Sequence, residues 1–475
     1  MKPKPNTPQG ASLKKRLDWI TTIIPFICIV ILCFLFMAFP QGSTSILESV
    51  RFFLGDQLGS YYLVIGLGAL ICSFYMAFSR YGKIKLGSLE KPQYSAFQWG
   101  SMMFTAGLAA DILFYSLCEW MLYANESHIT DMGSRQDWAS TYPLFHWGPI
   151  PWSFYIILAV SFGFMIHVRK RSKQKYSEAC RPLLGKRVDG ILGKLIDLTA
   201  VFALLAGTAT TFSLATPLLS MALSRVFGIE ESNLLTISIL VVICVVYTMA
   251  VYFGMKGVAK LAASCVYLFF ALLAYFLFLG GETRYIIETG ITAIGNLTQN
   301  FIGMATWTDA MRTSSFPQSW TIFYWAYWMV WCVATPFFIG TISKGRTIRQ
   351  TVLGGYFFGL AGTFTSFIIL GNYGLGLQMH GKLDLMALYE KTGSLYEAII
   401  AVFETMPLAQ AGLVLLAVTM IAFYATSFDA LTMVASSYSY KALGADEEPD
   451  KSVKLFWAVM LMLLPIALIF SENSM

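Results

Sequence analysis

The sequence predicts an all-α integral membrane protein with many transmembrane helices, and three properties of the chain support this fold class. Hydrophobic residues make up 56% of the 475 residues and charged residues only 13%, whereas soluble domains carry about 25% charged residues. The mean hydropathy is +0.62. Apolar runs of about 20 residues, the length that spans a bilayer as a helix, recur along the whole chain.

Eleven such runs define the expected transmembrane helices. They cover residues 19–39, 60–79, 96–123, 150–167, 192–223, 233–254, 258–280, 319–341, 351–373, 408–438 and 452–470. A polar, basic lead (1–18) precedes the first run, which is long enough to span, so we expect a transmembrane helix there and not a cleaved signal peptide. The segment 283–303 mixes charged and apolar residues, which predicts an amphipathic helix along the surface.

The distribution of Lys and Arg predicts the orientation. Four segments are basic: the N-terminal tail (1–18) and the loops 80–91, 169–187 and 344–349. With the N-terminus in the cytoplasm all four lie on the cytoplasmic side, as the positive-inside rule requires. The loops 124–142 and 374–396 then lie outside. An odd number of spans also leaves the C-terminus outside directly after the last span, so we expect that a twelfth helix is missing from this chain.

The composition argues against several other classes of function. The eight Cys are scattered with no CxxC pair, the four His are isolated, and no GxxxxGK[ST] phosphate loop is present. We therefore expect no disulfide, no His or Cys metal centre, no nucleotide cofactor and no enzyme activity. The net charge of +6 needs no nucleic-acid partner, because orientation already explains the basic loops.

One run, WTIFYWAYWMVW between Trp320 and Trp331, contains four of the 12 tryptophans of the chain. On a helix, Tyr324, Trp328 and Trp331 follow an i, i+4, i+7 pattern, with Trp325 and Tyr327 beside them. Such a stripe is typical of core packing, of an interfacial belt, or of a wall of π-faces that binds a cation. The run extends about three turns into the span, which is deeper than an interfacial belt reaches.

Four sequence motifs, in this order along the chain, resemble motifs of the betaine/choline/carnitine transporter family. They are FTAGLAADILFYSLCEW (104–120), YPLFHWGPIPWSFY (142–155), FPQSWTIFYWAYWMVW followed by ISKGRTIRQ, and FYATSFDA (423–430). The resemblance runs from about residue 54 to the last residue. It implies a LeuT-like core of two inverted five-helix repeats preceded by two extra helices, twelve spans in all, and a homotrimer. The chain would then divide into 19–95, a first repeat 96–280, a connection 281–318 and a truncated second repeat 319–475.

The resemblance also implies a substrate box. Trp147, Tyr155, Tyr327, Trp328 and Trp331 match its central positions, and Trp320 matches an outer, second substrate position. Tyr327 stands where the family usually has Trp. It keeps the π-face and adds a hydroxyl. For Trp147 an interfacial anchor at the start of a span is the structural alternative.

Asp111 is a carboxylate inside an expected span, where such groups are costly and usually functional. In the resembling family an aspartate here marks choline-type, proton-coupled members, whereas betaine carriers tend to have glycine. Choline brings no carboxylate of its own, so a protein carboxylate can balance its charge. The alternative is a structural carboxylate that neighbouring hydroxyls satisfy. Glu119 and Asp197 are more simply read as structural partners of Arg or backbone groups.

The resemblance places a coupling-ion site at Thr105, Leu108, Phe423, Thr426 and Ser427, where hydroxyls and free carbonyls suit Na⁺. A Thr–Ser pair in a span also commonly bonds to its own helix. Sodium-independent members can carry an arginine in the seventh span, but the corresponding residue here is Cys265. The choice between Na⁺ and H⁺ therefore stays open.

We therefore expect a transporter of a quaternary ammonium solute in the cell membrane, surrounded by lipid, with choline first and betaine or carnitine next. A substrate/product antiporter for carnitine- or betaine-like compounds is the alternative. A membrane sensor or a channel with the same fold belongs to a different class. No cofactor is expected beyond a coupling ion.

Overall fold

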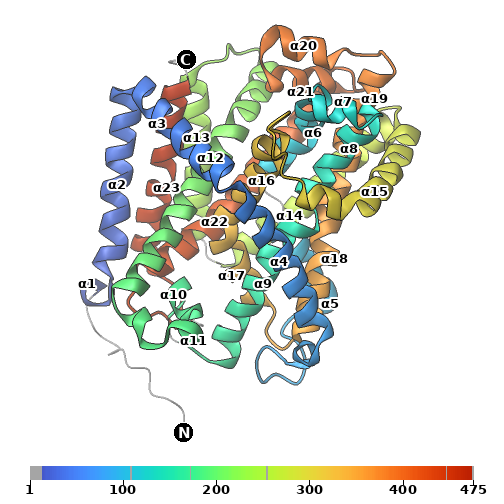
Figure 1. Cartoon of the computed structure of the whole chain (residues 1–475). Helices are drawn as coiled ribbons and strands as arrows, with labels where there is room; N and C mark the ends of the chain where they lie inside the picture. Colours follow the sequence, from blue (N-terminus) through green and yellow to red (C-terminus); the bar gives the residue numbers. More distant parts are fainter. Residues whose placement is uncertain (1–12, 107–109, 172, 253–254, 445–446, 473–475) are drawn as a thin grey trace.

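A computed structural model describes residues 13–106, 110–171, 173–252, 255–444 and 447–472 (Figure 1). Helices form nearly all of this part, and its β pairing consists of two isolated bridges, Leu17 with Tyr440 and Lys85 with Thr347. The all-α membrane class is therefore confirmed. Six helices in the described residues are long and apolar enough to cross a bilayer, or up to nine if each bent pair is one span, so the count of eleven stays a prediction.

Most expected spans coincide with helices. The main helices are α2 (Trp19–Ala38), α4 (Gly59–Phe78), α5 (Ala96–Ala106), α6 (Ala110–Ala124), α8 (Arg135–His146), α9 (Pro149–Gly163), α12 (Ile191–Phe227), α13 (Asn233–Tyr252), α14 (Met255–Ala274), α15 (Thr283–Thr306), α16 (Ile322–Val330), α17 (Thr335–Ile342), α18 (Ile348–Ser366), α19 (Asn372–Met379), α22 (Ala409–Tyr438) and α23 (Lys451–Glu472). The remaining helices are α1 (Leu13–Arg16), α3 (Pro40–Phe52), α7 (Ser127–Asp131), α10 (Tyr176–Ala179), α11 (Arg181–Leu184), α20 (Leu385–Thr392) and α21 (Leu395–Glu404).

Two expected single spans are broken in the structure. The span 96–123 divides into α5 and α6, whose directions differ by 62°. Residues 107–109, between the two helices, lie outside the described residues. The span 319–341 bends by 52° between Val333 and Thr335. Pro336, at the second position of α17, has no N–H to continue the ladder of the preceding helix.

Several segments expected as loops are helical. Residues 124–142 contain α7 and most of α8, and α8 leads directly into α9, so that residues 135–168 form one apolar stretch. The sequence analysis also missed α3, which begins at Pro40, a residue suited to a first helical turn. These helices are amphipathic or short, so a search for long apolar runs does not detect them.

The surface helix expected at 283–303 corresponds to α15. It leaves the preceding helix at an angle of 111° and packs along α8 and α19 (Figure 1). Ile287 and Ile291 are exposed on its outer side, whereas Ile286 and Ala293 are buried on its inner side.

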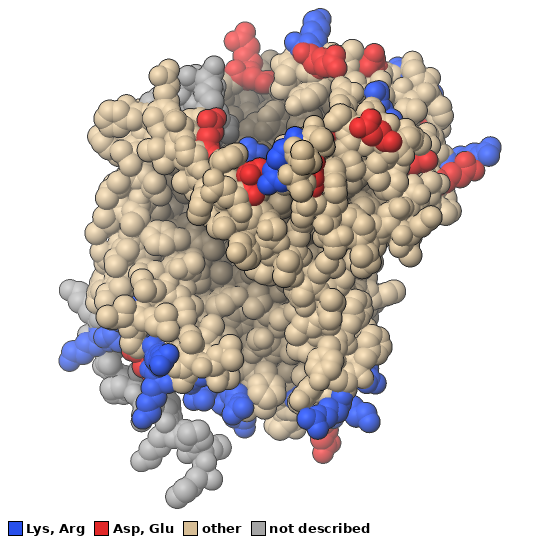
Figure 2. Space-filling model, viewed as in Figure 1, with Lys and Arg blue, Asp and Glu red and all other residues tan. Residues whose placement is uncertain are grey.

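The basic segments gather at one end of the molecule. Lys85 bridges to Thr347, which joins two of the basic loops, and Asp18 pairs with Lys175 at 3.0 Å, which joins the tail to the third. Figure 2 shows Lys and Arg with few acidic residues at this lower end, and most Asp and Glu of the visible face, together with further Lys and Arg, at the opposite end. A broad belt without charges separates them.

Candidate functional site

The aromatic run forms three consecutive helical pieces. A π-helical turn η6 (Pro317–Thr321) leads into α16, and a 3₁₀ turn η7 (Trp331–Val333) follows it. Tyr324 and Trp328 are buried on α16. α16 ends at Val330, and Trp331 begins the 3₁₀ turn. Its ring lies against Gly207 of α12, where an added Cβ would be 3.3 Å from it.

Four of the expected box residues lie together. The ring centroid of Trp328 is 4.8 Å from that of Tyr155 and 5.5 Å from that of Trp147. Trp147 also lies 6.3 Å from Tyr327. Trp147, at the junction of α8 and α9, and Tyr155, on α9, therefore meet α16, and all four side chains are buried. Interplanar angles of 47–64° give tilted or edge-to-face packing, which is the preferred geometry of aromatic pairs.

Further rings complete this cluster, and the sequence analysis did not assign them to it. Tyr115 lies 5.7 Å from Trp147, Trp152 lies 5.6 Å from Trp328, and Phe367 lies 5.2 Å from Trp147. Tyr115 could have been found from its position one turn after Asp111 on the same face of α6. Phe367 comes from a distant part of the chain and carries no local signal.

Asp111 lies next to this cluster, in the first turn of α6, and is 3% exposed. Its carboxylate accepts a hydrogen bond from the hydroxyl of Tyr327. Thr211 of α12 donates to the same carboxylate oxygen at 3.3 Å, and the backbone N–H of Ile112 donates to the other at 3.1 Å. The hydroxyl of Tyr327 is thus bonded to the Asp111 carboxylate, and the sequence analysis had singled out both residues.

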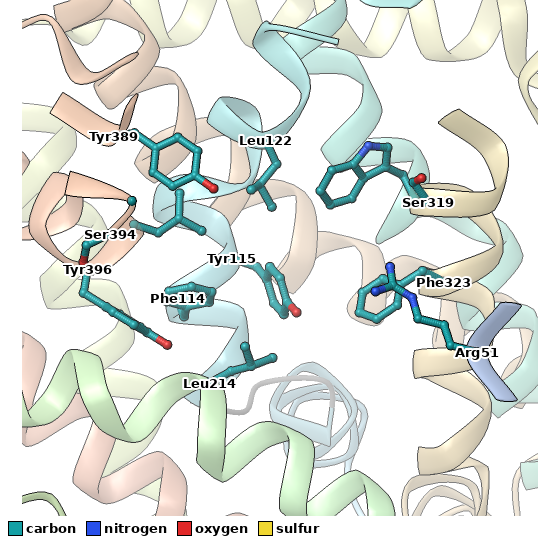
Figure 3. A pocket seen from close by; sticks show the side chains of 13 residues that line it. Arg51, Phe114, Tyr115, Leu122, Leu214, Ser319, Phe323, Tyr389, Ser394 and Tyr396 are labelled. Carbon is teal, nitrogen blue, oxygen red and sulfur yellow. The ribbon is translucent and has the colours of Figure 1, made fainter. Parts of the chain in front are cut away.

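Trp320 lines a cavity of about 500 Å³. Figure 3 shows this cavity from close by. Its indole N–H donates to Glu126 at 2.7 Å. The cavity is lined by Arg51, Phe114, Tyr115, Leu122, Leu214, Ser319, Trp320, Phe323, Tyr389, Gly393, Ser394, Leu395 and Tyr396. Tyr115 belongs to both this cavity and the central cluster, so the two regions adjoin.

The two other carboxylates differ in their partners, and of the two Asp197 has the backbone partner expected of a structural group. Glu119 accepts a hydrogen bond from the indole N–H of Trp147 at 2.6 Å. Asp197 accepts from the backbone N–H and the hydroxyl of Ser177, each at 3.0 Å. Glu119 thus contacts the substrate box, which the sequence did not indicate.

The expected ion-site residues show the intrahelical alternative. The hydroxyl of Thr105 donates to the Ser101 and Met102 carbonyls, and that of Thr426 to the Phe423 carbonyl at 3.0 Å. Cys265 of α14 lies opposite, with its sulfur 3.9 Å from the Thr426 hydroxyl.

For the remaining residues of the expected ion site, the structure gives burial only or no description. Ser427 is half-buried, Phe423 is buried, and Leu108 lies outside the described residues. The structure thus shows no assembled Na⁺ site among the residues it describes, and the ion site stays a prediction.

The chemistry of the central cluster is that of a cation site. Seven ring systems form the cluster and Tyr327 joins it to one carboxylate, and the described residues contain no group of His, Cys, Asp and Glu that could hold a metal ion. Aromatic faces attract a quaternary ammonium, which carries its charge on methyl groups and donates no ordinary hydrogen bond.

Comparison with known proteins agrees with this chemistry. The chain matches the model of the betaine/carnitine/choline family transporters over residues 20–475. The glycine betaine transporter OpuD of Bacillus subtilis is 31% identical over 442 residues, which cover 91% of this chain and 84% of the relative. A probable glycine betaine transporter of Desulfitobacterium hafniense is 30% identical over 435 residues, covering 90% and 86%.

A third relative is named for a different substrate. The carnitine transporter of Acinetobacter baumannii is 28% identical over 417 residues, covering 86% of this chain and 75% of the relative. The match of the family model to nearly the whole chain, together with these relatives and the aromatic site, excludes an enzyme and identifies a multi-pass membrane protein. The chain belongs to the betaine/carnitine/choline family of transporters.

Proposed function

We propose that this protein is a secondary active transporter that carries choline across the cell membrane, with its N-terminus in the cytoplasm. The observation that carries the choice of choline is the hydrogen bond between Tyr327 and Asp111. It places a carboxylate against an aromatic wall, where it can balance the charge of a cation that has no carboxylate of its own. The gathering of the basic segments at one end supports the orientation.

The two broken helices support a mechanism of alternating access. Substrate would bind between α6 and α16, close to the breaks that follow α5 and precede α17. Breaks of this kind free backbone groups at mid-membrane and allow one part of each helix to move against the other. The bound ion would shift the equilibrium between outward and inward states. The Na⁺ site would use Thr105, Leu108, Phe423, Thr426 and Ser427, and the expected assembly is a homotrimer.

A second candidate is uptake or exchange of a zwitterion such as glycine betaine or carnitine. The names of the relatives favour it, since two are called glycine betaine transporters and one a carnitine transporter. Arg51 is the single charged residue among those that line the outer cavity, and it could meet a substrate carboxylate there.

Uptake into proteoliposomes distinguishes these candidates. Labelled choline, betaine and carnitine are supplied in turn, with sodium and proton gradients imposed separately. We expect the highest kcat/KM for choline. A preference for betaine or carnitine would replace the first candidate by the second. Trans-stimulation by unlabelled substrate identifies a carrier, because a channel gives none.

A further inference from the structure

Glu119 is a fully buried carboxylate in α6 without a Lys or Arg partner among the described residues. Its Oε2 accepts a hydrogen bond from Trp147 at 2.6 Å and its Oε1 accepts one from the Tyr123 hydroxyl at 2.6 Å. The nearest basic group is His146, whose Nδ1 lies 3.9 Å from Oε1. Both side chains of this pair are 0% exposed. An ionised carboxylate in such a position is costly, so the group gains from binding a proton.

The hydrogen bonds of Glu119 continue into a chain that ends at the aromatic segment. The hydroxyl of Tyr123 lies 2.8 Å from Nδ1 of His146. Nε2 of His146 lies 3.0 Å from the hydroxyl of Thr321, the last residue of η6. We refer to Glu119, Tyr123, His146 and Thr321 as the Glu119 chain. It links α6 and α8 to the start of α16, and Trp147 attaches it to the substrate box.

The direction of these hydrogen bonds depends on one proton. When Glu119 is ionised, the single Tyr123 hydroxyl proton goes to Glu119. The neutral His146 ring then donates from Nδ1 to Tyr123 and accepts at Nε2 from Thr321. When Glu119 is protonated, each bond points the other way, and Nε2–H donates to Thr321.

Proton transfer along the chain connects the two arrangements and balances. A proton added at Nε2 lets the Nδ1 proton pass to Tyr123, and the Tyr123 proton pass to Glu119. One proton passes along each hydrogen bond, and the Glu119 chain as a whole gains one proton. We propose that Glu119 is a proton-binding site of this transporter and that His146 and Tyr123 relay the proton to it.

Trp147 connects this site to the substrate box. Its indole N–H donates to Glu119 in either state, but a hydrogen bond to an ionised acceptor is about twice as strong. Proton binding therefore loosens the hold on Trp147, whose ring packs on Trp328 at 5.5 Å. This coupling to substrate rests on the proposed transport function, whereas protonation of Glu119 does not.

The other titratable groups around Glu119 do not compete for this role. They are Tyr115, Cys118 and Tyr123 on α6, His146 on α8 and Tyr324 on α16, with Asp111 two turns away on α6. Phenols and thiols are ordinarily protonated at neutral pH. Near neutrality the proton thus has two places within the Glu119 chain, Glu119 and His146, and the Asp111→Asn variant below separates Asp111 from them.

Infrared spectroscopy of the purified full-length protein tests the site without any substrate. A protonated carboxylic acid has a carbonyl band that a carboxylate lacks. We expect a band that titrates with pH in the wild type, persists in Asp111→Asn and is lost in Glu119→Gln. A spectrum in which Glu119→Gln removes no such band at any pH at which the protein stays folded would overturn the proposal, whatever the protein transports.

Uptake of labelled choline tests the coupling. In Glu119→Gln the amide oxygen can accept from Trp147 while the amide N–H₂ donates to Tyr123, which mimics the protonated state. We expect choline to bind but its uptake to become equal with and without an imposed proton gradient. Tyr123→Phe, which interrupts the relay, should have the same effect.

The matched control is Tyr356→Phe, which removes a buried hydroxyl bonded to Ser73 on another helix pair. It should keep the response of the wild type. An unchanged response to the proton gradient in Glu119→Gln would refute the coupling. If no choline uptake is measurable in the wild type, the proposed function fails and the infrared result still decides on the proton site.

Discussion

The hydroxyl of Tyr327 donates a hydrogen bond to the carboxylate of Asp111, so that an aromatic wall and the carboxylate nearest to it form one unit. Thr211 donates to the same oxygen from α12. Three helices therefore meet at one buried carboxylate. The hydroxyl partners that the structural alternative expects are present, and the cation-balancing role of Asp111 stays a proposal.

Asp111→Gly should weaken choline transport more than betaine transport. Choline depends on the protein for a counter-charge, whereas betaine carries its own. We expect the KM for choline to rise about tenfold or more relative to that for betaine, equivalent to about 1.4 kcal/mol. Uptake competition between the two substrates measures the ratio. An equal loss for both would mean that Asp111 acts by holding α6, α12 and α16 together.

Trp328→Leu should abolish uptake while expression and folding persist. Trp328 contacts Trp147, Trp152 and Tyr155, and each π-face that holds a quaternary ammonium contributes about 0.5–2 kcal/mol. Substrate binding by calorimetry and uptake at equal protein amount are the measurements. Phe357→Leu is the control, because Phe357 is 70% exposed and lies outside the box. Retained uptake in Trp328→Leu would rule out the box as the binding site.

Gly359→Ala should disturb the substrate box indirectly, through Trp152. A Cβ at Gly359 of α18 would lie 2.7 Å from the ring of Trp152, and this ring packs on Trp328. Such overpacking costs about 1–3 kcal/mol, so we expect a lower thermal midpoint and weaker substrate binding. Gly68→Ala on α4 is the matched control, since a Cβ there meets nothing within 4 Å. Alanine at Gly68 should be neutral or slightly stabilising, because glycine is about 1 kcal/mol poorer in a helix. Equal midpoints for both variants would show that α18 adapts.

His128 should make the protein sensitive to acid. Burial lowers the pKa of His128 from 6.5 to about 4 in the folded state. Its ring stacks on Trp307 at 3.8 Å and bonds to the Tyr142 hydroxyl at 2.7 Å. Because the folded state favours the neutral ring, this contribution is complete above pH 6.5 and is lost as the pH falls towards 4.

The thermal midpoint in detergent, measured across this pH window, checks the role of His128. It should fall less steeply in His128→Phe, which keeps a ring against Trp307 but cannot bind a proton. A parallel decline in both proteins would assign the acid sensitivity to other groups.

The sequence by itself determined the membrane class, the positions of most long helices and the family. These follow from the length of the apolar runs and from short sequence motifs, and both are properties of residues that are neighbours in the chain. It also selected Trp147, Tyr155, Tyr327 and Trp328, which the structure brings together. It did not show that a 3₁₀ turn replaces the α-helix at Trp331.

The tertiary structure alone decided which polar groups meet. Asp111 and Tyr327 are far apart in the chain, as are Glu119 and Trp147, and no local pattern encodes either hydrogen bond. The sequence could show that a carboxylate inside a span needs a partner, because its burial is costly. Only the packing of α6 against α8, α12 and α16 supplies these partners. The same packing surrounds Glu119 with the hydrogen bonds that make it a candidate proton site, whereas the sequence alone suggested a structural residue.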